Sequence, residues 1–346
     1  MEKAAFTDLI GNDSVKETLK NRILSSRLSH AYLLEAPQGQ GKHMLALRIA
    51  MALACEHKDD ASLPLPCMRC PACKKILGGN SPDVIYVKRE KDKATFGVGP
   101  IREMRADVAI APFELSKKVY ILEEAHLMTD QAQNALLLTL EEPPSYALFL
   151  LLCDRIEPML ETIRSRAPVL RLLPVPTDRM REHLLSTSGD AKELEARSPQ
   201  EMRELIAAAD GSIGRALALL DERRRKPILA QRRLTRQMIE LYAQRHQTVA
   251  ALKLLKSFPE KREDLIAQLR VTLTALRDLL ICKQSDVAPL CFFFEREEAM
   301  ELAYPFTTAE LLALTDRMIL CIDELSRNAN VRLALTALAQ DTGLLT

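Results

Sequence analysis

The chain has 346 residues, with 48 Lys and Arg against 47 Asp and Glu. This length exceeds one ordinary hydrophobic core, so two or three domains are expected, and the near-zero net charge excludes a globally basic nucleic-acid binder, although not a local basic groove. No apolar segment follows the first residues, and no apolar run approaches the ~20 residues of a membrane helix, so a cytoplasmic protein without a membrane partner is expected.

The first predicted strand, residues 31–35, leads into an altered phosphate loop, E-A-P-Q-G-Q-G-K-H, and an apolar helix at 44–55. A working loop follows G-x-x-x-x-G-K-[ST], in which backbone N–H groups and Lys bind phosphates and the hydroxyl binds Mg²⁺. The loop keeps Gly39, Gly41 and Lys42. Ala36 replaces the first glycine and His43 replaces the hydroxyl residue. Imidazole is a poor ligand for a hard cation, which argues against efficient binding of ATP with Mg²⁺.

Four cysteines cluster directly after this helix: Cys55, Cys67, Cys70 and Cys73. The last three are spaced by two residues each in C-M-R-C-P-A-C, and prolines hold the segment in a loop. Such gaps let thiolates converge on one tetrahedral ion at ~2.3 Å. Four thiolates leave no open coordination position, so this pattern predicts a structural zinc. Four free thiols in a loop are the alternative.

The next predicted elements are strands at 84–87 and 118–122, the second ending in the acidic pair Glu123 and Glu124. Carboxylates at the carboxyl end of a buried strand lie where open α/β sheets bind their ligands. A helix follows and stops at a pair of prolines. A buried strand is then predicted at 148–152, and an arginine, Arg166, precedes the last strand at 168–172.

Beyond this alternating pattern the chain is predicted to be helical. Three short helices are expected between Thr177 and about Glu222, followed by a charged linker, RRRKP, at 223–227. Long amphipathic stretches are expected at 229–257, 260–282 and 307–342.

The stretch KKVYILEEAHLMTDQAQNALLLTLEEPP, followed by LETIRSRA, resembles the AAA+ clamp-loader subunits of bacterial DNA polymerase III, especially those of the delta-prime type. The resemblance covers the whole chain and is strongest over residues 30–172. It implies an α/β AAA+ fold with a RecA-like parallel sheet, an inserted zinc module, a small helical lid and an all-α collar. The corresponding boundaries are 1–174 with the zinc module at 55–73, 175–224, and 225–346.

The same resemblance implies roles for individual residues. Arg166 is expected to be an arginine finger that reaches the γ-phosphate of a neighbouring subunit. Glu123 stands where the family has a metal-side Asp, and Glu124 matches the carboxylate that polarises water. Cys153 falls at or next to a polar sensor position, and Arg215 falls one residue after the arginine that senses nucleotide. Together with His43, these changes predict loss of efficient ATP turnover.

The function that the resemblance implies is that of a stator in a five-membered ring with the ATPase (gamma/tau) subunits and the delta subunit. The ring opens the sliding beta clamp and places it on primed DNA. Two alternatives remain: an active ATPase motor subunit of the same loader, and a zinc-stabilised DNA-binding module that acts alone.

Overall fold

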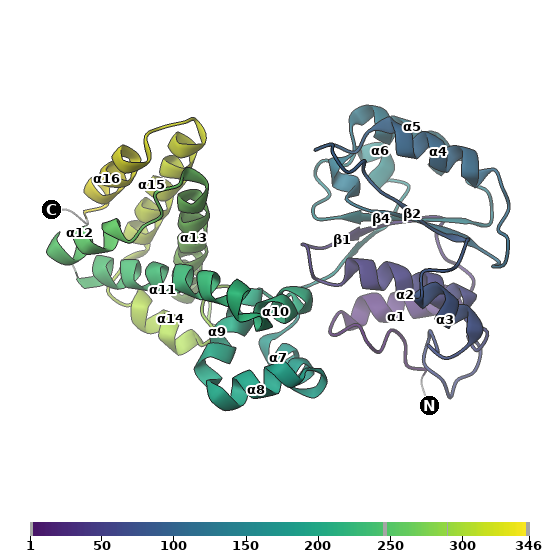
Figure 1. The fold of residues 1–346 in the computed structure, drawn as a ribbon, viewed down its shortest axis with the longest axis horizontal. Coiled ribbons are helices and arrows are strands. Elements are labelled where there is room, and N and C mark those ends of the chain that lie inside the picture. The colour runs from purple at the N-terminus through teal and green to yellow at the C-terminus, as the bar shows by residue number, and fades with distance from the viewer. Residues whose placement is uncertain (1–2, 245–247, 289, 344–346) are drawn as a thin grey trace. The chain divides into compact units, whose positions relative to one another are not determined.

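The structure, a computed structural model, describes residues 3–244, 248–288 and 290–343. The chain divides into two compact units (Figure 1). The first contains residues 1–180 together with 211–214, and the second contains residues 181–210 together with 215–346.

The first unit is built on a five-stranded sheet whose strand order is β2-β3-β4-β1-β5. Every neighbouring pair is parallel. The strands are β1 (Ala31–Glu35), β2 (Val84–Val87), β3 (Lys118–Leu122), β4 (Ala147–Cys153) and β5 (Val169–Arg171). They confirm the five predicted strands to within two residues at either end. The parallel sheet that the resemblance implied is confirmed.

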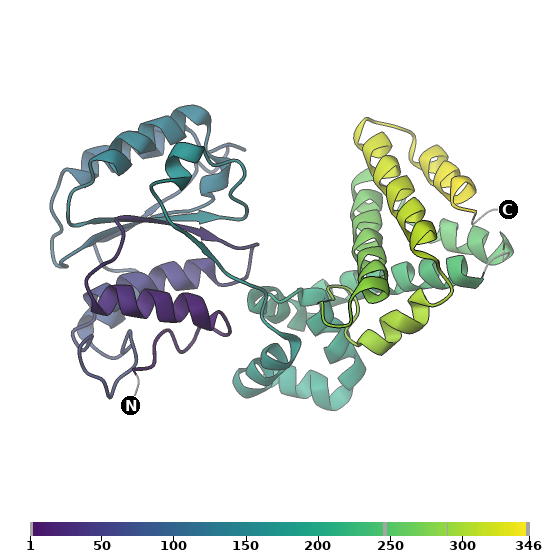
Figure 2. The same ribbon diagram turned by 180° about the vertical axis from the view of Figure 1, so that it is seen from behind.

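Helices cover both faces of this sheet, as Figures 1 and 2 show. One face carries α1 (Asp13–Leu24), α2 (Lys42–Ala54) and α3 (Pro71–Leu77). The other carries α4 (Val98–Val108), α5 (Asp130–Glu141) and α6 (Glu161–Arg164), with the short 3-10 helix η1 (Ala125–Leu127) after β3. Successive strand residues therefore alternate between two apolar cores, so that Ile121 faces the first layer and Tyr120 the second. Both faces are covered, which explains why the central strands are continuous apolar runs.

The second unit is helical, and none of the helices in the described part of the chain is long and apolar enough to cross a membrane. Its first helices are α7 (Thr177–Thr187), α8 (Gly189–Arg197), α9 (Pro199–Ala209) and α10 (Ile213–Leu220). The first residues of α7 and of α10 belong to the first unit. The remaining helices are α11 (Glu222–Gln244), α12 (Thr248–Lys256), α13 (Arg262–Gln284), α14 (Arg296–Ala303), α15 (Thr308–Ser326) and α16 (Val331–Asp341). Four helices, not the expected three, thus lie between residues 177 and 220. The three-domain division stays a prediction.

The charged linker predicted at 223–227 is wrong, because α11 runs through it without a break. Arg225 is only 3% exposed, pairs with Glu201 at 2.9 Å, and donates to the carbonyl oxygens of Leu219 and Leu220 at 3.1 and 2.7 Å. Its guanidinium thereby satisfies carbonyls at the end of α10 that have no partner within that helix. A run of charges usually marks a solvated hinge, but here one member of the run is a buried structural group.

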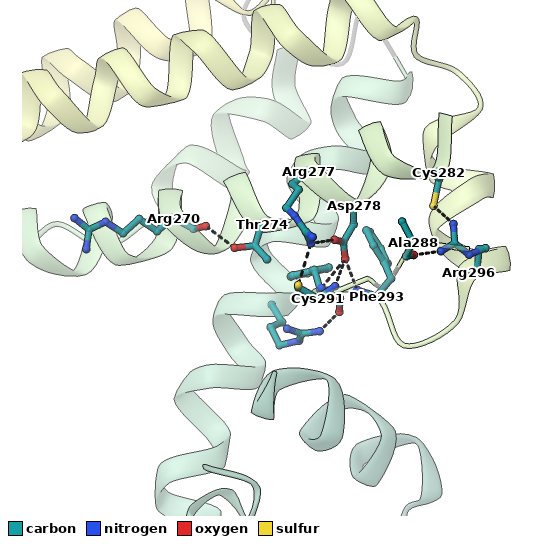
Figure 3. A network of polar contacts seen from close by, with 11 residues as sticks. Arg270, Thr274, Arg277, Asp278, Cys282, Ala288, Cys291, Phe293 and Arg296 are labelled. Atoms are coloured by element: carbon teal, nitrogen blue, oxygen red, sulfur yellow. Dashed lines mark hydrogen bonds and ion pairs between the residues drawn. The ribbon is translucent and has the colours of Figure 1, made fainter. Parts of the chain in front are cut away.

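A buried aspartate fixes the loop between α13 and α14 (Figure 3). The side chain of Asp278 on α13 is fully buried, and its Oδ2 accepts from the backbone N–H groups of Cys291, Phe292 and Phe293 at 2.8, 2.6 and 3.2 Å. Its Oδ1 accepts from Arg277, whose guanidinium is half exposed. Three N–H groups on one carboxylate hold the aromatic pair Phe292–Phe293 in the core of the second unit.

Candidate nucleotide site and metal site

The altered phosphate loop joins the carboxyl end of β1 to the start of α2, the position predicted from the sequence. Gly39 and Gly41 have φ values of 84° and 90°, in the left-handed region that glycine adopts without strain. Gly41 is the N-cap of α2 and Lys42 its first residue. The loop thus keeps the backbone geometry of an anion-binding helix start, although its sequence has lost a glycine and the hydroxyl.

The lysine of this loop is already bound by groups of the same chain. Lys42 is 4% exposed, and its ammonium donates to the carbonyl oxygen of Ala36 at 2.9 Å. It also forms an ion pair and hydrogen bond with the Asp154 carboxylate. Asp154 directly follows β4, which pairs with β1 in the sheet, so the two side chains meet although 112 residues separate them.

The acidic pair after β3 is likewise paired with basic residues. Lys88 lies 3.1 Å from Glu123, and the Arg89 guanidinium lies 3.1 Å from Glu124. Both basic residues follow β2, the strand next to β3, so the parallel sheet brings the four side chains to one edge. Neither basic residue was predicted, although their place directly after an apolar strand was a usable signal.

His43 lies at the same edge, with its Nδ1 3.9 Å from Glu123. Burial lowers the pKa of His43 and outweighs the opposing effect of Glu123, so the imidazole is neutral at pH 7. The structure therefore brings the predicted residues of the nucleotide site together. It supplies no hydroxyl at the place where the phosphate loop usually provides one for Mg²⁺.

Two further groups shape this site. The backbone N–H of Asp154 donates to Nδ1 of His126 at 3.2 Å, and burial lowers the pKa of His126, which favours the neutral ring. The backbone N–H of Gly214 donates to the carbonyl oxygen of Gly39 at 3.2 Å, and a Cβ at residue 214 would lie 3.0 Å from that oxygen. Gly214 stands one residue before Arg215, where the resemblance expected a nucleotide-sensing arginine.

Arg166 lies just past α6 and is held at the surface by its own subunit. Its guanidinium lies 3.0 Å from the Glu141 carboxylate at the end of α5, and donates to the carbonyl oxygen of Thr162 at 3.0 Å. The Arg166 side chain is 36% exposed to solvent. A surface ion pair of this kind is weak, so the guanidinium is free to exchange partners at low cost.

The four clustered cysteines converge as predicted. The sulfur atoms of Cys55, Cys67, Cys70 and Cys73 all lie within 4.8 Å of one another, and all four residues are buried. Tetrahedral coordination at about 2.3 Å would place the sulfurs about 3.8 Å apart, so a small contraction would suffice. Backbone N–H groups support the set, since Cys67, Cys70 and Cys73 each donate to the preceding cysteine sulfur at 3.4 Å.

Burial and hydrogen bonds shift the pKa values of the clustered cysteines in opposite directions. Burial raises the pKa of Cys55 and Cys73, which leaves neutral thiols packed together in the absence of an ion. Burial also opposes ionisation of Cys67, yet backbone N–H groups of Arg69 and Cys70 lower its pKa to about 6. A cation bound among the sulfurs would favour thiolate at all four positions. The donor set fits a structural zinc, with no position left for water or substrate.

Residues 11–176 match the family described as DNA polymerase III, delta subunit. The chain is 37% identical over 218 residues to the DNA polymerase III subunit tau of Bacillus subtilis, covering 63% of this chain and 37% of that protein. It is 34% identical over 223 residues to the subunit tau of Escherichia coli, covering 63% of this chain and 32% of that protein. The chain therefore spans about a third of the length of the curated relatives it matches.

Solved structures give a weaker likeness. A gamma subunit-related protein of DNA polymerase III from Thermotoga maritima is 17% identical, with 95% of this chain and 98% of that chain covered and a TM-score of 0.39. A Bacillus subtilis DNA clamp loader delta protein is 11% identical, with 94% and 99% covered and a TM-score of 0.37.

Proposed function

We propose that this chain is a clamp-loader subunit of the delta-prime type that does not itself hydrolyse ATP, because residues 11–176 match the DNA polymerase III delta-subunit family and the chain is similar to DNA polymerase III subunit tau. In this role it joins ATPase (gamma/tau) subunits and a delta subunit in a ring that loads the sliding beta clamp onto primed DNA. Zinc bound by the four cysteines would stabilise its first unit without taking part in chemistry.

The observation that carries the non-hydrolysing role is the pairing of charged groups at the nucleotide site. Lys42 is bound by Asp154, and both carboxylates after β3 are paired with basic residues. Phosphoryl transfer depends on a free lysine for the phosphates, a hydroxyl and carboxylate for Mg²⁺, and a carboxylate for the attacking water. Here the hydroxyl is replaced by the neutral imidazole of His43, and each of the other groups would have to leave an internal partner first.

The exposed guanidinium of Arg166 supports a role in trans. Its partners are the Glu141 carboxylate and the Thr162 carbonyl, and the ion pair with Glu141 lies at the surface. A guanidinium offered to a neighbouring active site would counter the charge that develops on a transferring phosphoryl group. A subunit with a finger and an inactive site of its own fits a stator.

An active motor subunit of the same loader is the second candidate. The curated relatives reported above are named subunit tau, and the chain keeps Gly39, Gly41 and Lys42 in a phosphate-loop conformation. The two candidates differ in one measurable property, the ATPase rate of the isolated chain.

Steady-state ATPase assays separate the candidates. The isolated chain should hydrolyse ATP no faster than background; robust turnover that Lys42→Ala abolishes would make it a motor subunit. In a loader reconstituted with clamp and primed DNA, Arg166→Ala should cost about 10³-fold or more at the one site that the finger completes. Arg166→Lys should rescue poorly, because an ammonium lacks the planar fork of guanidinium.

Arg164→Ala is the matched control, since Arg164 is an exposed arginine two residues away that the proposal gives no role. An Arg166→Ala loader that assembles normally and hydrolyses ATP at the wild-type rate would show that the finger role is wrong. A loader that loses activity equally with Arg164→Ala would point to a general effect of charge on this surface.

A further inference from the structure

The environment of Lys42 is unusual for a lysine that is meant to meet phosphate. The side chain is 5% exposed, and two groups of the chain, the Ala36 carbonyl and the Asp154 carboxylate, accept its hydrogen bonds. A buried ammonium is unfavourable unless a counter-charge and hydrogen-bond acceptors accompany it. Asp154 supplies both.

We propose that Asp154 is an internal anion that takes the place of a nucleotide phosphate on Lys42, so that the phosphate loop of this chain excludes polyphosphates. The inference deepens the proposed non-hydrolysing role and rests on it. It assigns the loss of nucleotide binding to a specific residue that lies outside the altered loop sequence.

The carboxylate is held in place through its own backbone. Asp154 directly follows β4, whose register against β1 is fixed along the strand by pairs such as Cys153 with Glu35. Its N–H donates to Nδ1 of His126 in η1. The other ring nitrogen, Nε2, lies 3.9 Å from the Asp154 carboxylate. The position of this carboxylate beside Lys42 therefore follows from the sheet and from a neutral imidazole, not from a long flexible side chain.

The loop is also held from a second direction. Gly39 accepts a hydrogen bond from the backbone of Gly214, and the two backbones approach so closely that a Cβ on residue 214 would lie 3.0 Å from the Gly39 oxygen. The chain's own groups thus hold the loop in place at the lysine, through Asp154, and at the Gly39 carbonyl, through Gly214. A nucleotide would have to displace Asp154 and would gain no metal contact from His43.

The expected gain in ligand affinity follows from the ion pair between Asp154 and Lys42 that a phosphate must replace. A hydrogen bond to a charged partner is worth a factor of about 10 to 100 in an equilibrium constant. Asp154→Asn removes the negative charge and keeps the shape of the side chain. It should therefore tighten binding of ADP and of inorganic pyrophosphate by about 10- to 100-fold.

Isothermal titration with each ligand, without Mg²⁺, measures this directly. Wild-type protein should show no binding at millimolar ligand, whereas Asp154→Asn should bind pyrophosphate, and ADP at least as tightly if the adenosine also finds contacts. The double variant Asp154→Asn with Lys42→Ala should lose this binding. Glu157→Gln, which removes an exposed carboxylate three residues away, is the matched control and should behave as wild type.

A thermal melt provides a second readout. Asp154→Asn leaves Lys42 without its counter-charge, so the melting temperature of the variant should be lower than that of wild type. Pyrophosphate should raise the melting temperature of the variant and leave that of wild type unchanged. Asp154→Ser serves as a second variant should the first fail to fold.

Two results would overturn the proposal: wild type binding either ligand as tightly as the Asp154 variants, or folded variants that gain no affinity. Neither result concerns ATP turnover by the isolated chain, so the non-hydrolysing role is tested separately.

Discussion

The buried carboxylate of Asp278 should contribute more to the stability of the second unit than any exposed ion pair. Asp278→Ala removes the acceptor of three backbone N–H groups, of which those of Phe292 and Phe293 are buried. A buried donor left without a partner costs about 1–3 kcal/mol, so the expected loss in free energy of unfolding is about 3–5 kcal/mol in total.

Asp278→Asn separates hydrogen bonding from charge. The amide oxygen can still accept from the loop, although neutral hydrogen bonds are about half as strong as charge-assisted ones. Burial raises the pKa of Asp278, which means that the ionised form is disfavoured inside the protein and that removing the charge returns part of the loss. The expected cost of Asp278→Asn is therefore only about 1 kcal/mol.

Arg277→Ala is the matched control. Arg277 pairs with the same carboxylate at 3.0 Å but is half exposed, so its loss should cost less than about 1 kcal/mol. The chain has no Trp, so urea unfolding is best followed by circular dichroism at the helix minimum. With a slope of about 2 kcal/mol per molar urea, Asp278→Ala should lower the midpoint by about 1.5–2.5 M.

The two compact units need not unfold together, so the helical signal should be accompanied by hydrogen exchange at the backbone amides of Cys291, Phe292 and Phe293. These amides should lose protection in Asp278→Ala and keep most of it in Asp278→Asn. If Asp278→Ala lowers the midpoint no more than Arg277→Ala does, the three hydrogen bonds do not hold this loop and the reasoning is refuted.

Two further predictions concern the first unit. Purified protein should contain about one zinc per chain by elemental analysis. Cys70→Ser should release the zinc and loosen residues 55–73 while leaving the sheet folded. Carefully prepared wild-type protein without zinc would contradict the site. Burial opposes ionisation of Asp83, but hydrogen bonds from the backbone N–H groups of Phe113, Glu114 and Leu115 outweigh burial and lower the pKa of Asp83. The stabilisation from Asp83 is therefore fully present above the pKa that this group has in the unfolded chain, and it is lost as the pH falls through the pKa in the folded protein. Urea midpoints between pH 6 and pH 3 should therefore fall more steeply for wild type than for Asp83→Asn, and equal slopes would show that Asp83 does not carry this dependence.

Local patterns in the sequence were enough to predict the strands, the cysteine cluster and the altered phosphate loop. A strand buried on both faces has a short continuous run of apolar residues in its sequence, and two-residue gaps between cysteines indicate a set of zinc ligands. The change at His43 is visible in one residue. Each of these features depends on residues that are neighbours in the chain, so periodicity and spacing carry the information.

The partners of the functional groups depended on the tertiary structure. Lys42 and Asp154 lie 112 residues apart, and Glu123 meets Lys88 only because β2 and β3 are adjacent in the sheet. A parallel sheet collects the carboxyl ends of strands that are distant in sequence, and no local pattern states which end lies beside which. The sequence showed that the phosphate loop is altered. Only the fold showed that its lysine, Lys42, is paired with the carboxylate of Asp154, which follows β4.

The charged run at the start of α11 is a second feature that the local sequence did not explain. Its composition is that of a solvated linker, and nothing in the local pattern distinguishes Arg225 from its neighbours. The helix turns that one side chain toward the carbonyls that end α10 and toward Glu201, where it is buried and paired. Burial depends on what packs against a residue. The sequence alone therefore determined where the strands form, and the packing of the helices decided which charges became structural.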